Sequence, residues 1–128
     1  MFWRKWVGLP WAWGADPRDG KGACCFRTAQ AAREELGLPW PSDRMGDWYV
    51  RAQRGDWTGL KCDWADATEQ ISKPEAGALL RFDNPDGGFG VGVLVEAEIV
   101  VTVRHQGRLV AAPRRALYSP RFYQLKCN

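Results

Sequence analysis

The sequence predicts an α+β fold, with helices in its first half and an antiparallel sheet in its second half. A length of 128 residues suits one domain. Strong helix formers occur before residue 73, whereas short β-branched segments separated by turn residues follow it. All eight tryptophans lie before residue 65. We therefore expect a single domain, residues 1–128, with a tryptophan-rich helical part over about 1–72 and a sheet part over about 73–125.

The clearest helical segment covers residues 25–36. It is rich in good helix formers, and Gly37 follows it where a C-terminal cap belongs. The residues spaced to share one face of this helix are Cys25, Ala29, Ala32 and Leu36. Cys25 is therefore expected in the first turn, with its side chain directed toward the structure on which the helix packs.

Shorter elements are expected on both sides of that helix. The sequence predicts further helical segments over residues 3–7, 45–54 and 64–71. Its β-branched apolar segments predict strands over residues 78–82, 91–95, 99–103 and 108–111, and residues 118–125 are expected to close the sheet. Turn-forming residues at 84–88 and 105–107 separate these strands, which favours an antiparallel meander.

Composition excludes several classes of protein. At 45% hydrophobic and 26% charged residues, the chain is typical of a globular protein. No apolar run approaches the ~20 residues of a membrane-spanning helix. The first seven residues mix charges with aromatic side chains, so no secretory signal is predicted. We expect neither a membrane protein nor an exported precursor.

The C-terminal quarter is basic. No carboxylate side chain follows Glu98, whereas five arginines and one lysine do: Arg104, Arg108, Arg114, Arg115, Arg121 and Lys126. Such a segment can face an acidic partner or nucleic acid. The arginines are spread out and not interleaved with stacking aromatics, so a solvated face with some subunit contacts is favoured over a nucleic-acid site.

Four cysteines are present, namely Cys24, Cys25, Cys62 and Cys127. Without an export signal we expect them to be reduced. Zinc sites use paired ligands with a short gap, and two adjacent cysteines with a single histidine in the chain do not supply that pattern. No metal and no cofactor is predicted.

Cys25 is a candidate nucleophile because of its position at the start of a helix. Free backbone N–H groups and the helix dipole stabilise a thiolate there. A catalytic cysteine also needs a base, usually histidine, which a third polar group holds in place. The structural alternative is that Cys25 is a small buried apolar residue.

Sequence motifs on both sides of the helix point to a known family. Residues 11–14 read Trp-Ala-Trp-Gly, residues 22–26 read Gly-Ala-Cys-Cys-Phe, and residues 36–41 read Leu-Gly-Leu-Pro-Trp-Pro. This order resembles the NlpC-type cell-wall cysteine peptidases, especially their phage-tail versions. The resemblance implies a papain-like α+β fold, with N-terminal helices packed on a small antiparallel sheet, and it places Cys25 at the nucleophile position.

The second half is similar to the strands of that family. Residues 73–82 are similar to its Pro-x-x-Gly-Asp-Leu-Val-Phe strand, and residues 88–95 to its Gly-His-Val-Gly-Ile-Tyr-Val strand. The hairpin over residues 100–110 is similar to the family's next hairpin, whose first strand carries the third polar residue. The resemblance spans roughly residues 9–117.

The chain departs from the family at positions that carry chemistry. Cys24 replaces the usual Asp before the nucleophile, Arg27 replaces a Gly, and Ala78 replaces the Asp of the Gly-Asp strand. The position of the general base aligns with Gly90, next to Phe89, and neither residue can accept a proton.

The remaining polar candidates are Thr102, near the third position, and His105, the chain's single histidine, three residues further on in an expected turn. His105 is the only candidate base, and a solvated side chain is the alternative for it. Loss of a base typically lowers the rate by ~10²–10⁴-fold. We therefore expect a dismantled triad.

The tryptophans add a further hypothesis. Those near the N-terminus are Trp3, Trp6, Trp11 and Trp13. Tryptophan is enriched at protein interfaces and can also stack on sugars. The placement of these four beside a chain terminus favours an interface or packed core over a glycan platform.

The resemblance, taken with the missing base, implies a structural protein of a phage tail or tail-like particle, at the tip or hub or as an adaptor, built on a degenerate, inactive NlpC-type domain. Its expected partners are other particle proteins, with peptidoglycan as a second candidate, and its expected location is the virion tail after synthesis in the host cytoplasm. The alternative is an active peptidoglycan endopeptidase or amidase, with Cys25 as nucleophile and His105 or a partner's histidine as base. A weaker alternative is a glycan- or nucleic-acid-binding module.

Overall fold

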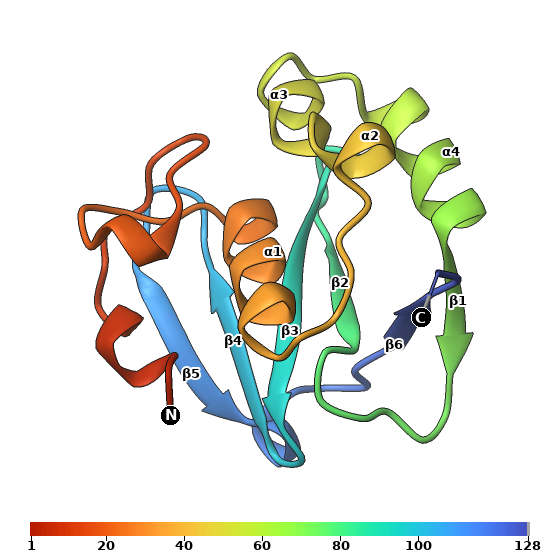
Figure 1. Cartoon of the computed structure of the whole chain (residues 1–128). Coiled ribbons are helices and arrows are strands. Elements are labelled where there is room, and N and C mark those ends of the chain that lie inside the picture. The colour runs from red at the N-terminus through yellow and green to blue at the C-terminus, as the bar shows by residue number, and fades with distance from the viewer. Residues whose placement is uncertain (128) are drawn as a thin grey trace.

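The sheet contains six antiparallel strands and organises the whole α+β molecule (Figure 1). The computed structural model describes residues 1–127. The strands follow the spatial order β1-β6-β2-β3-β4-β5. Their bounds are β1 (Thr68–Ile71), β2 (Leu79–Asp83), β3 (Phe89–Glu96), β4 (Ile99–Val103), β5 (Leu109–Pro113) and β6 (Phe122–Leu125). The predicted α+β class is confirmed.

Helices cover one face of this sheet. They are α1 (Cys25–Glu35), α2 (Ser42–Met45), α3 (Trp48–Gln53) and α4 (Trp57–Ala67), with short 3-10 turns η1 (Arg4–Trp6), η2 (Pro17–Asp19) and η3 (Arg114–Ala116). Figure 1 shows α1 lying across β3 and β4, with α2, α3 and α4 grouped toward the β1 side. The predicted α1 is confirmed to within one residue at its C-terminal end.

The segment that follows α4 differs from the sequence prediction. A helix over residues 64–71 is wrong for its second half, because α4 begins at Trp57 and ends at Ala67. Thr68 begins β1, and its hydroxyl donates to the Trp64 carbonyl at 2.7 Å. Residues 68–71 are extended because they pair with β6, more than fifty positions later in the chain. Such distant pairing overrides local propensity.

Two other predicted elements are shorter than expected. The helix predicted over 45–54 is limited to α3, and Met45 is the last residue of the separate helix α2. The closing strand over 118–125 is limited to β6, from Phe122. Ser119 has a positive φ of 43° and Pro120 follows it, so this part of the chain turns before it joins the sheet.

The core has two parts, one on each face of the sheet. The larger cluster lies between the sheet and the helices and includes Phe26, Ala29 and Ala32 of α1 with Phe89 and Val91 of β3. The smaller cluster lies on the opposite face and contains Ala78, Leu80, Leu94, Val100 and Phe122, with Ile71, Phe82 and Leu117 packed against it. Successive strand residues alternate between the two clusters, as a pleated sheet requires.

The N-terminal segment covers the β5 edge. Gly8 donates to the Leu109 carbonyl and Leu109 donates to the Leu9 carbonyl, each at 2.9 Å. Trp3 and Trp6 are buried, at 7% and 1% exposure. Trp13 remains 37% exposed, so the four N-terminal tryptophans divide between core and surface. Among residues 1–127, no helix has the length and apolar character needed to cross a bilayer.

Candidate functional site

The candidate site is the start of α1, where Cys24 and Cys25 meet the sheet. Cys24 is the N-cap of α1: its backbone is extended, and its sulfur accepts a hydrogen bond from the Arg27 N–H at 3.4 Å. The Cys24 N–H donates to the Ala15 carbonyl at 3.1 Å, which fixes the preceding loop against the helix. Cys24 therefore performs the capping role that Asp, Ser or Thr usually performs.

Cys25 begins α1 as predicted, but its thiol is not activated. Burial raises the pKa of the Cys25 thiol to about 12, although hydrogen bonding to the backbone of Val91 acts to lower that pKa. A helix N-terminus stabilises a thiolate by ~0.3–1 kcal/mol, which is less than about one pKa unit. Burial therefore outweighs the helix dipole, and the thiol is neutral near pH 7.

The adjacent thiol behaves in the same way. Burial raises the pKa of Cys24, and hydrogen bonds from the backbone of Arg27, Gly14 and Phe26 act in the opposite direction. All four cysteines are free, and Cys62 and Cys127 are exposed on the surface. Cys24 is buried and Cys25 is half-buried, and for both thiols the effect of burial on the pKa outweighs the groups that favour a thiolate, which for Cys24 include the charge of Arg27.

No base faces the thiol from β3. Phe89 packs on the α1 side, with its ring centroid 6.0 Å from that of Phe26 and 5.5 Å from that of Trp64. Gly90 belongs to the other face by strand alternation, because a Cβ built on Gly92 would meet Phe82 and Val100 of the smaller cluster. At the start of β3, the side chain that faces α1 is therefore the aromatic ring of Phe89.

Thr102, at the predicted third polar position, bonds to the backbone. Its hydroxyl donates to the Val91 carbonyl at 2.8 Å, and its backbone pairs with Gly92 across β3 and β4. Cys25 and Thr102 therefore both contact Val91, the thiol through hydrogen bonding to its backbone and the hydroxyl through its carbonyl. Thr102 nevertheless lies on the face of the sheet opposite α1, because it alternates with Val101 and Val103 of the larger cluster, so the structure does not bring its side chain together with Cys25.

His105 lies in the turn between β4 and β5, where the sequence placed it. Its side chain is exposed, and its ring centroid lies 4.2 Å from that of Trp11 and 5.6 Å from that of Trp13. Within residues 1–127, no hydrogen bond joins His105 to Cys25. The only histidine of the chain is therefore engaged with tryptophans, not with the candidate nucleophile.

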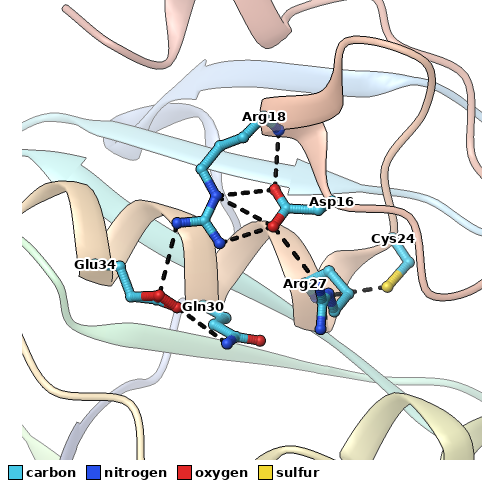
Figure 2. Close-up of polar contacts among 6 residues, drawn as sticks. All are labelled: Asp16, Arg18, Cys24, Arg27, Gln30 and Glu34. Carbon is cyan, nitrogen blue, oxygen red and sulfur yellow. Dashed lines mark hydrogen bonds and ion pairs between the residues drawn. The ribbon is translucent and has the colours of Figure 1, made fainter.

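Sequence reasoning missed a polar cluster that fastens the 12–23 loop to α1 (Figure 2). Asp16 caps η2 and accepts hydrogen bonds from the Arg18 backbone at 2.9 Å and the Arg18 guanidinium at 2.7 Å. Arg27 approaches the same carboxylate at 3.6 Å, and Arg18 reaches Glu34 of α1 at 3.6 Å. Gln30 donates to Glu34 at 3.0 Å.

The electrostatics of this cluster favour an ionised Asp16. Burial acts to raise the pKa of Asp16, but hydrogen bonds from Arg18 and the charges of Arg18 and Arg27 together lower it. The Asp-Pro dipeptide at 16–17 was the available sequence signal, since Asp before Pro is a common N-terminal helix cap. Both carboxylates of the cluster, Asp16 and Glu34, are paired with arginines of the same cluster. These pairs join the loop to α1, so the role of the cluster is to hold the loop in position.

No metal site is present in the described part of the chain: it contains no group of three or more His, Cys, Asp or Glu side chains placed to hold an ion. The reactive group that the site itself offers is the Cys25 thiol at the start of α1. No protein-family model matches the sequence, and no curated protein matches it.

Proposed function

We propose that this protein is a structural component of a phage tail or tail-like particle, built on a papain-like NlpC-type domain that no longer catalyses. The observation that carries the loss of catalysis is the state of Cys25, a neutral thiol with Phe89 and Gly90 where a base would be needed. The particle assignment rests on the resemblance to phage-tail versions of the family.

The chemistry argues against peptide cleavage by this thiol. With its pKa raised to about 12, the thiol is almost entirely protonated at pH 7, and the thiolate is the attacking species. The absence of a general base lowers the rate by a further ~10²–10⁴-fold. Helix N–H groups alone do not compensate for both losses.

Residues at the altered family positions now contribute to stability. Cys24 caps α1, and Arg27 approaches Asp16 and lies 5.4 Å from the Tyr49 ring. Ala78 is 5% exposed in the smaller cluster, and Phe89 is 2% exposed in the larger one. The replacements Cys24, Arg27 and Ala78 each have a packing, capping or ion-pair role, and Phe89 beside Gly90 packs in the core, which supports a domain maintained for its shape.

The proposed partners are other proteins of the particle, and the proposed location is the assembled tail. A direct test is mass spectrometry of particles purified from the host culture, compared with particles from a host in which the gene carries an early stop codon. The proposal predicts that the chain copurifies with wild-type particles and that its loss reduces the yield of complete tails. Its absence from purified particles, with normal tail assembly in the mutant, would contradict the proposal.

A second test addresses the rival function, an active peptidoglycan endopeptidase or amidase. Purified peptidoglycan is incubated with the wild-type chain, with Cys25→Ala, and with an active cell-wall peptidase as positive control. We expect neither form of this chain to release muropeptide fragments. Release by the wild type and not by Cys25→Ala would establish the enzyme and overturn the inactive assignment.

A further inference from the structure

The face of the sheet opposite α1 contains a hollow that the site above does not use. Its volume is about 540 Å³, and its apolar lining is Ile71, Pro120 and Phe122. Ile71 and Phe122 belong to the smaller core cluster or pack against it, which places the hollow on that face. Two arginines, Arg114 and Arg121, line it, and no carboxylate residue does.

Arg114 has unused hydrogen-bonding capacity. It is half-buried, and its guanidinium carbon lies 4.8 Å from the centre of the Phe122 ring. Within the described chain, this guanidinium has a ring contact but no hydrogen bond and no ion pair. A guanidinium carries five N–H donors in a planar fork that fits a carboxylate. A partly desolvated arginine without an acceptor is best satisfied by an anionic group from outside the chain.

Arg121 is held in place at the border of this hollow. It donates to Asp83 at 2.7 Å, and Asp83 also accepts from Arg81 at 2.8 Å. One carboxylate therefore lies between two guanidinium groups, and the local charge remains positive. A second hollow of about 370 Å³ shares Pro120 and Arg121 with the first and extends to Tyr118.

Tyr118 is the most exposed of the large hydrophobic side chains among the described residues, at 97% exposure. It precedes Ser119, whose positive φ of 43° is a conformation that non-glycine residues rarely adopt. Strained backbone is concentrated at functional sites. Tyrosine and arginine are enriched at protein interfaces, where they supply most of the binding energy.

We propose that these two hollows form a docking surface for an acidic segment of a partner protein. A carboxylate of that segment pairs with Arg114, and an apolar side chain packs on Tyr118. The charge supports this occupant, since three arginines line the two hollows (Arg81, Arg114 and Arg121) against a single carboxylate residue, Asp83, which pairs with Arg81 and Arg121. Nucleic acid would need a continuous stripe of unpaired basic groups, whereas Arg121 already has a carboxylate partner. This inference depends on the proposed function in one respect: the proposed function identifies the partner as a protein of the same particle.

The test uses the purified full chain and fluorescence anisotropy. The probe is a fluorescein-labelled octapeptide of alternating glutamate and leucine, compared with a peptide of alternating glutamine and leucine and with a ten-nucleotide oligothymidylate. We expect the acidic peptide to bind, and to bind more weakly as salt concentration rises. Arg114→Gln should weaken binding by about fivefold or more, which corresponds to one charge-assisted pair.

Two further variants keep the test decisive. Arg104→Gln removes an equal charge from the exposed β4–β5 turn and should change binding by less than about twofold. Tyr118→Ala, at a side chain whose removal leaves the core intact, should weaken binding by about threefold or more. Amide chemical shifts on titration should change around Ser72, Arg114 and Phe122.

The outcomes separate this inference from the proposed function. Absence of acidic-peptide binding, equal losses in Arg104→Gln and Arg114→Gln, or shift changes centred elsewhere would overturn the docking surface. Preferential binding of the oligothymidylate that Arg114→Gln abolishes would also overturn it, in favour of nucleic acid. None of these results bears on whether the chain copurifies with particles, which tests the structural role independently.

Discussion

Cys25 shows how the surroundings of a residue decide its chemistry. The sequence located this thiol at the start of α1 from helix formers and spacing, and that prediction is correct. The sequence could not give its protonation state, because the burial that raises its pKa to about 12 is produced by packing against β3, more than sixty positions away. The role of Asp16 was missed for a similar reason. Its partner Arg27 belongs to α1, and the loop between them must fold back before the two side chains can meet.

Asp16 should stabilise the protein in a pH-dependent way. Its pKa is lower in the folded protein than its ordinary value, so its contribution is present above about pH 4 and is lost as pH falls through the folded pKa. Asp16→Asn should lower the free energy of unfolding by about 1–2 kcal/mol at pH 7 and by much less near pH 2. Urea unfolding at the two pH values measures this.

Asp66→Asn is the control for that prediction. The Asp66 side chain is 74% exposed and lies 3.7 Å from Arg44, so its loss should change stability by less than about 0.5 kcal/mol. Equal effects of the two substitutions would show that the cluster in Figure 2 does not fasten the loop.

Gly90→His should fold and remain inactive. A Cβ at Gly90 meets no atom within 4 Å, so the strand has room for a side chain. The new imidazole would project from the face of the sheet opposite α1. It would therefore not reach the Cys25 thiol, which would stay neutral. Muropeptide release and the ultraviolet absorbance of a thiolate at neutral pH are the measurements, and either signal appearing in this variant would contradict the assigned geometry of β3.

Among the elements, those with complete local signals were predicted well. α1 has helix formers and a terminal glycine, and β4 has five consecutive β-branched residues at the predicted positions, 99–103. β1 was predicted as helix because its strand conformation depends on pairing with β6. The burial of Arg33 was also not predicted from the sequence, because a completely buried charged side chain is not expected on the apolar side of a helix.

Arg33 connects α1 with two other segments of the chain, the one that follows α1 and the one that precedes β2. Its guanidinium donates to the Gly77 carbonyl at 2.8 Å and to the Pro39 carbonyl at 2.9 Å. Arg33→Met should lower the free energy of unfolding by about 3 kcal/mol, because two carbonyls lose a charged donor. Arg54→Met, at an exposed position, should change it by less than about 0.5 kcal/mol. Comparable losses in chemical denaturation would contradict a specific role for Arg33.

For the whole molecule, helix-then-sheet order was sufficient to predict the α+β class. The sequence did not predict how the two sheet faces would be used. The helices and the N-terminal segment leave the second face with only a small cluster and the 117–121 loop over it, and that face carries Arg114 and Tyr118. This asymmetry emerges only when strands from distant parts of the sequence pair.

The free energy of unfolding should fall in alkali because of the two thiols at the start of α1, Cys24 and Cys25. The pKa of both Cys24 and Cys25 is raised in the folded state, so as pH rises above about 9 the unfolded chain loses these protons first. The free energy of unfolding should therefore decrease between pH 9 and about 12. The double variant Cys24→Ala, Cys25→Ala should show a shallower decrease in urea titrations, and an unchanged slope would contradict neutral buried thiols.

The most direct measurement is the rate of iodoacetamide alkylation of each cysteine as a function of pH, followed by peptide mass spectrometry. Exposed Cys62 and Cys127 serve as internal references in the same sample. The account predicts that Cys25 is alkylated more slowly than both at pH 7 and that its rate is still increasing at about pH 10. A Cys25 rate that exceeds both references and levels off below about pH 8 would show an activated nucleophile and contradict the account.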